Sequence, residues 1–149
     1  MQAPMPTLFG RATAIYGEHA ELHGSVSELR ACCVALKGGR TTTELDMRSA
    51  LEHFLRRLRR HFAREESDGY FGTVIASLPD RNVDIAWLQA EHGEIIETML
   101  ELIRMCEYGD GQRLAGALER TIEAFEAHER RETELIQGFL QSDNAAAAD

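Results

Sequence analysis

The chain has 149 residues, 25 of them acidic and 16 basic, which gives a formal net charge of -9 at pH 7. This length fits one domain, and a content of 44% hydrophobic and 28% charged residues excludes a disordered or fibrous chain. The acidity argues against binding to nucleic acid or to anionic membranes, because both need a positive field.

Three clusters of helix-breaking residues divide the chain into four segments, and they lie at 37–40, 77–80 and 109–111. The first segment, about residues 7–36, repeats apolar or histidine residues at steps of four and three, which is the spacing of one helix face. The second segment follows the capping run at 41–43 and keeps the same spacing from Met47 to Glu65. It can continue to about residue 77, bent at Gly69 or Gly72.

The third segment opens after Pro79 and Asp80, and its apolar face extends from Ile85 to Cys106. The fourth segment has the same spacing from Leu114 to Phe139. No segment alternates with the two-residue period of a strand. We therefore predict an all-α fold.

Short connections make consecutive helices neighbours, so the four helices are expected to form an antiparallel up-down-up-down four-helix bundle. We assign residues 1–141 to this bundle. The small, polar residues 142–149 are expected to be a short disordered C-terminal tail.

Each predicted helix has a histidine where a core hydrophobe is expected: His19, His61, His92 and His128. On the same faces, glutamates follow two of them by four residues, namely Glu65 and Glu132. Burying such groups without partners is costly, so six of them in one core need a common reason. Counted from the connections near 39 and 110, the four histidines lie within about 6 Å of one height, at about 1.5 Å per residue.

Imidazoles and carboxylates that converge inside a bundle are typical of di-metal centres, in which carboxylates bridge two ions. A buried polar network without metal is the alternative. The two glutamates favour metal, because they supply the negative charge that divalent ions need.

The stretches that carry these residues are EHAELH at 18–23, HFAREE at 61–66, EHGEI at 91–95 and HERRE at 128–132. In this order they resemble the hemerythrin-like HHE cation-binding domain over nearly the whole chain. The resemblance implies a cofactor of two iron ions, joined by an oxo or hydroxo bridge. It also implies terminal ligands His19, His61, His92 and His128 and bridging ligands Glu65 and Glu132.

The sequence departs from the oxygen-carrying hemerythrins at Ile96, where those proteins have a second histidine on the third helix. The coordination position opposite Ile96 is either open or filled by another side chain, and His23 is the candidate for an extra ligand. His53 fits a flanking position better than a ligand. Four acidic neighbours of the ligands could orient imidazole N–H groups: Glu18, Glu66, Glu91 and Glu129. Tyr16 and Tyr70 could gate the site or donate hydrogen bonds.

Three cysteines, two of them adjacent, cannot form an even disulfide framework. With no signal peptide pattern and no apolar run of about 18 residues, this predicts a reducing, cytoplasmic location. Cys33 and Cys106 are expected to be core residues, with a redox pair as the alternative. The basic run Arg56–Arg64 is either a solvated face paired with glutamates or a face for a protein partner.

Three functions compete at this stage. The first is a module that binds or senses dioxygen, nitric oxide or iron at a four-His, two-Glu site. The second is a di-iron enzyme acting on peroxide or nitric oxide, or an iron donor in the repair of damaged iron–sulfur centres. The third is a metal-free helical interaction protein that uses the basic face.

Overall fold

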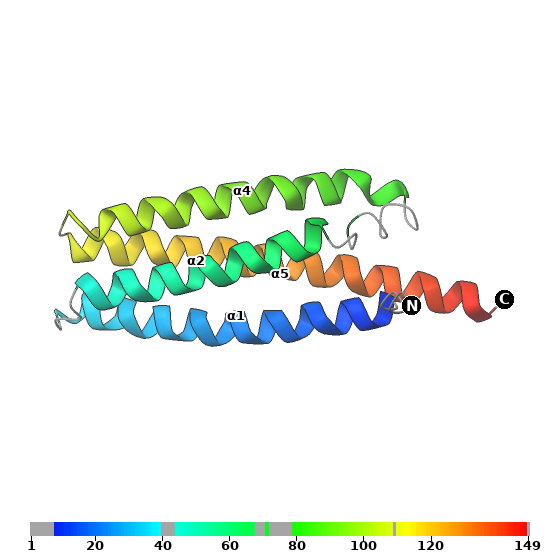
Figure 1. The fold of residues 1–149 in the computed structure, drawn as a ribbon, viewed down its shortest axis with the longest axis horizontal. Helices are drawn as coiled ribbons and strands as arrows, with labels where there is room; N and C mark the ends of the chain where they lie inside the picture. Colours follow the sequence, from blue (N-terminus) through cyan, green and yellow to red (C-terminus); the bar gives the residue numbers. More distant parts are fainter. Residues whose placement is uncertain (1–7, 40–43, 68–70, 72–78, 109, 149) are drawn as a thin grey trace, which may run out of the picture.

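The structure, a computed structural model, describes residues 8–39, 44–67, 71, 79–108 and 110–148. Its elements are α1 (Leu8–Lys37), α2 (Glu44–Ser67), the short 3-10 helix η1 (Pro79–Arg81), α4 (Asn82–Met105) and α5 (Gly111–Ala148). Successive long helices point in opposite directions, so α1 begins and α5 ends at the same end of the bundle (Figure 1). The predicted all-α antiparallel four-helix bundle is confirmed.

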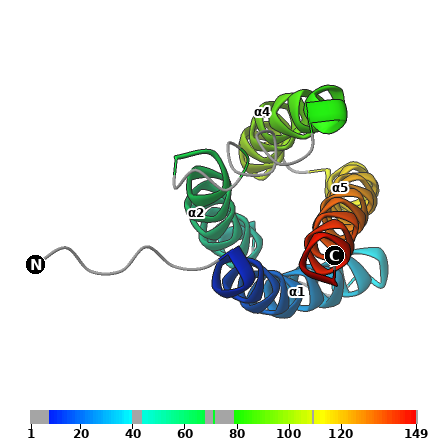
Figure 2. The same ribbon diagram turned by 90° about the vertical axis from the view of Figure 1, so that its right-hand side faces the viewer.

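Viewed along its axis, the bundle is a ring of four helices (Figure 2). α1 packs against α2 and α5, and α4 packs against the same two helices from the opposite side. Chain neighbours are therefore spatial neighbours, as short connections require. The predicted continuation of the second segment to residue 77 and the capping run at 41–43 lie outside the described residues.

The helix ends near the first and third connections follow from local chemistry. After α1, Gly39 has a φ of 69°, a left-handed conformation that glycine adopts without a Cβ clash. Before α5, Asp110 Oδ1 accepts hydrogen bonds from the backbone N–H groups of Gln112 and Arg113 at 3.1 and 3.2 Å. Asp110 thus satisfies two donors that the first turn of a helix leaves open.

α5 continues to Ala148, beyond the boundary expected at residue 141. Alanine has the highest helix propensity of any residue type, so the four alanines at 145–148 favour this extension. The division of the chain at residue 141 stays a prediction. Among the described helices, none combines the length and the apolar composition that a membrane crossing needs.

The apolar core consists of two clusters, one on each side of a polar layer. The larger cluster fills the end of the bundle near the first and third connections, and Leu22, Phe62, Ile95 and Phe125 are its members closest to the layer in sequence. The smaller cluster lies toward the termini: Ile15, Phe71, Ile85, Leu88, Leu135 and Ile136. On α1, α4 and α5 the buried histidine lies between members of the two clusters, and on α2 His61 lies beside Phe62 at the end of the larger cluster. All four long helices therefore contribute to the polar layer.

Candidate metal centre

The polar layer contains all six residues that the sequence selects. They are buried, with relative exposures of 1–6%: His19, His61, Glu65, His92, His128 and Glu132. α1 and α4 contribute one histidine each, and α2 and α5 contribute a histidine and a glutamate one turn later. The spacing of four places each pair on one face of its helix, so both side chains reach the same interior point.

The six residues form two groups of four that share the two glutamates. His19 and His61 with Glu65 and Glu132 make the first group, and His92 and His128 with the same glutamates make the second. In each group the ligand atoms lie within 4.8 Å of one another. Two groups that share two carboxylates match a site for two ions bridged by those carboxylates.

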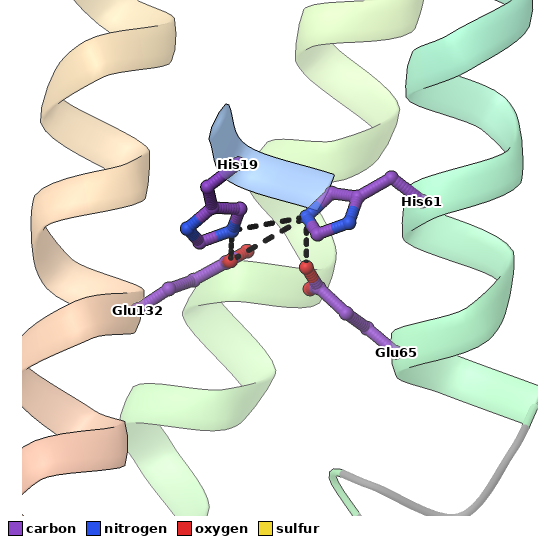
Figure 3. A group of neighbouring side chains, drawn as sticks. All are labelled: His19, His61, Glu65 and Glu132. Atoms are coloured by element: carbon purple, nitrogen blue, oxygen red, sulfur yellow. Dashed lines mark hydrogen bonds and ion pairs between the residues drawn. The ribbon is translucent and has the colours of Figure 1, made fainter. Parts of the chain in front are cut away.

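In the first group, His19 Nε2 lies 3.1 Å from Glu132 Oε2 and 3.2 Å from His61 Nε2, and Glu65 Oε1 is in close contact with His61 (Figure 3). The second group has a similar arrangement. His92 Nε2 lies 3.2 Å from Glu65 Oε2 and 3.3 Å from Glu132 Oε1, and His128 contacts the same Glu132 oxygen. The ring centroids of the two histidines are 4.9 Å apart in both groups.

The donor atoms fit a cation better than they fit one another. Among the described residues, both carboxylate oxygens of Glu65 and the Nε2 atom of His128 are buried without a hydrogen bond of acceptable geometry. Each lies close to an oppositely charged neighbour but makes no hydrogen bond with it. Unsatisfied buried polar atoms are rare in folded proteins, and a shared ion would satisfy them together.

In three histidines the Nδ1 atom, which faces away from the centre, is hydrogen-bonded to a carboxylate on a neighbouring helix. His61 Nδ1 donates to Glu18 at 2.6 Å, His92 Nδ1 to Glu66 at 2.9 Å, and His128 Nδ1 to Glu91 at 2.7 Å. We call these three glutamates the outer carboxylates. An ionised carboxylate only accepts, so each Nδ1 carries the proton, and Nε2 is left as the atom that faces the centre.

Two of the outer carboxylates are themselves held by arginines: Arg64 pairs with Glu18, and Arg131 pairs with Glu91. The sequence had suggested that glutamates beside the ligands could orient imidazoles. It did not show that each would serve a histidine of another helix. It also missed these arginines, although Arg64 and Arg131 each immediately precede a cluster glutamate in the chain.

Three histidines of the cluster, His61, His92 and His128, have a raised pKa in the absence of metal. Burial on its own lowers the pKa of His61, but the adjacent carboxylates of Glu132 and Glu65 outweigh it and raise the pKa to about 11. For His92, too, burial lowers the pKa, but Glu132 and Glu65 outweigh this effect and raise it to about 9. Burial on its own raises the pKa of Glu132, but the four histidines around it hold the pKa well below its usual value. Binding of a metal must therefore displace protons.

His23 does not join the cluster. Its side chain is 57% exposed, and its Nε2 atom lies 2.9 Å from Glu129 Oε2. Glu129, the fourth acidic neighbour suggested by the sequence, is thus paired with His23 rather than with a ligand histidine. Ile96 is partly buried and packs against the larger apolar cluster.

The remaining sequence candidates lie at the surface or in the core. His53 is exposed, Tyr16 is 36% exposed, and Tyr70 lies outside the described residues. Cys33 and Cys106 are both buried in the larger apolar cluster. Burial raises the pKa of the Cys33 thiol to about 11, so this cysteine is a poor nucleophile.

Aromatic rings cover the second group, a feature that the sequence analysis missed. The ring of Phe62 stacks on His92 with centroids 3.8 Å apart and an interplanar angle of 9°. Phe71 stacks on the same histidine at 5.8 Å. Phe62 directly follows the ligand candidate His61, and this adjacency was the available signal.

The model of the hemerythrin HHE cation-binding domain matches residues 11–140, and the chain belongs to this family. The match includes all four helices and all six residues of the cluster. Comparisons with curated proteins and with solved structures gave no match. The chain is therefore a hemerythrin-like four-helix bundle with a buried His/Glu cluster compatible with metal binding.

Proposed function

We propose that the cluster is a di-iron site at which the protein binds or senses dioxygen, nitric oxide or iron. The observation that carries this proposal is that two ligand groups share Glu65 and Glu132. If only one group binds an ion, the two histidines of the other group have no ion to coordinate. Two ions use all six side chains.

The donor set is compatible with iron. Imidazole and carboxylate together suit divalent first-row metals, whereas neither group contains a thiolate, which would favour zinc or copper(I). The four positive charges of two divalent ions exceed the two negative charges of the bridging carboxylates. When bound, such a pair of ions supplies electrons and open positions to a small acceptor that becomes anionic as it is reduced.

The chain's own residues support that chemistry in two ways. The outer carboxylates hold the imidazole rings in one tautomer and orientation, which limits rearrangement when a ligand arrives. The two apolar clusters on either side of the layer exclude water, because their members are almost fully buried. Electrostatic interactions are strengthened in such an environment.

The test is to load the protein with iron without oxygen, count iron per chain, and add dioxygen or nitric oxide to the reduced form. We expect two irons per chain and a spectral change that saturates at a fixed ratio of ligand to iron. A protein that holds clearly fewer than two irons per chain would contradict the proposal. Steady-state consumption of peroxide or nitric oxide, lost in Glu65→Ala, would instead identify the enzyme.

A further inference from the structure

A shallow groove between α1 and α5 connects the surface with the cluster. Its volume is about 540 Å³, and Tyr16, His19 and His23 of α1 face Glu129 of α5 across it. His19 and Glu129 are its buried residues, with relative exposures of 6% and 5%. Because His19 belongs to the first ligand group, the groove reaches the candidate metal centre itself.

Like two residues of the cluster, Glu129 has a buried polar atom that makes no hydrogen bond. Its Oε1 atom is buried without a hydrogen-bond partner among the described residues, and the other such atoms belong to Glu65 and His128 in the cluster. Its Oε2 atom is paired with His23, whose side chain is mostly exposed. Glu129 therefore has one carboxylate oxygen available to a cation and the other held by a histidine that can reach solvent.

The groove has one exposed donor and two buried ones. The side chain of His23 is 57% exposed, that of Glu129 is 7% exposed, and that of His19 is 8% exposed. Glu126 and Glu134 also line the groove, together with Arg130. A cation entering from solvent thus meets an exposed imidazole, then a buried carboxylate, then a member of the cluster.

Within the part of the chain that the structure describes, the other sides of the cluster are less accessible to a cation. The groove between α1 and α2 touches His61, but its three arginines outnumber its two glutamates, and this excess of positive charge repels a cation. Phe62 and Phe71 cover the ring of His92. His128 is closed off by Glu91, which Arg131 holds in place.

We propose that His23 and Glu129 form a transient binding site for a divalent transition-metal cation, Fe²⁺ in the first instance, on its way into the cluster. This inference rests on the proposed function, since it assumes that the cluster takes up metal. One imidazole and one carboxylate are too few donors for a permanent site, and both are of the kind that such cations bind.

The experiment measures uptake rates rather than activity. Co²⁺, whose visible absorption reports its coordination, is mixed with the metal-free full-length protein and followed in time. His23→Ala removes the exposed donor without disturbing the core, and Glu129→Gln removes the buried charge at constant volume. His53→Ala is the matched control, because His53 is an exposed histidine on α2.

Both variants are expected to slow uptake about tenfold or more, because an acidic path raises association rates by about 10–10³. The final number of ions, their affinity and their spectrum should equal those of the wild type. Release to excess chelator must then slow by the same factor, since the equilibrium is unchanged. His53→Ala should behave as the wild type.

Wild-type uptake rates in both variants would overturn the proposal. A changed spectrum or a lower final metal content in Glu129→Gln would also overturn it, because Glu129 would then be a permanent ligand. Failure of the wild-type protein itself to bind two ions would refute the proposed function instead. The two failures are thus distinguished by the wild-type titration.

Discussion

Glu132 is the residue whose loss should affect the centre most, because it interacts with all four histidines of the cluster. Glu132→Gln keeps the volume and removes the charge. Breaking a buried ion pair by removing one partner costs about 3–5 kcal/mol. For a chain of 149 residues, where 1 kcal/mol corresponds to about 2–4 °C, the melting temperature of the metal-free variant should fall by about 6–20 °C.

The effect on metal should be larger still, because Glu132 belongs to both ligand groups. Loss of a residue that merely orients a ligand costs about 10–100-fold in metal affinity, so loss of a shared donor should cost at least about 100-fold for both ions. His92→Ala, which removes a member of one group, should leave one binding position in the other.

The assay combines thermal unfolding in chelator with a competition titration by a coloured chelator. Glu123→Gln is the control, because Glu123 is an exposed glutamate of the same helix. The reasoning is refuted if Glu132→Gln binds two ions as tightly as the wild type, or if its metal-free form melts at the same temperature as that of Glu123→Gln.

Three further predictions concern the surroundings of the cluster. Glu91→Gln should weaken metal binding about 10–100-fold in the same titration, because it removes the acceptor for His128 Nδ1, whereas the exposed Glu94→Gln should not. The metal-free protein should lose stability to urea as the pH rises from about 6.5 through 9 to 11, because the folded pKa values of His61 and His92 are about 11 and 9 and lie above the unfolded value. Phe62→Ala should cost about 3–5 kcal/mol in denaturant unfolding, because the ring is 3% exposed and stacks on His92.

Each of these three predictions can be contradicted by one result. Equal metal affinities of the Glu91 and Glu94 variants would mean that the outer carboxylate does not orient His128. An increase in the stability of the metal-free protein between pH 7 and pH 9 would contradict the raised histidine pKa values. A loss below about 1 kcal/mol in Phe62→Ala would show that the ring is not part of a packed core.

The fold could be predicted because its signals are local. Steps of three and four fix a helix face, and residues such as Asp110 and Gly39 mark where helices begin or end. The end of α5 is different. Ser142, Asp143 and Asn144 are weak helix formers and suggested a tail, whereas the four alanines that follow favour a helix, and α5 ends at Ala148.

The meeting of the six cluster residues could be predicted because bundle depth follows from counting residues along antiparallel helices. The hydrogen-bond partners of the cluster histidines outside the cluster could not be predicted. Glu18 and Glu129 each adjoin a cluster histidine in sequence, yet the first orients His61 of another helix and the second pairs with His23. Such choices depend on how the helices are rotated about their axes, which residue spacing alone does not fix.

The central claim is that two irons share Glu65 and Glu132 in one buried centre. Its most direct test is iron analysis together with the optical spectrum of the aerobic, iron-loaded protein. We expect two irons per chain and the charge-transfer band of a bridged diferric pair, both absent from Glu132→Gln. One iron per chain or less, or two irons without that band and unaffected by Glu132→Gln, would contradict the claim.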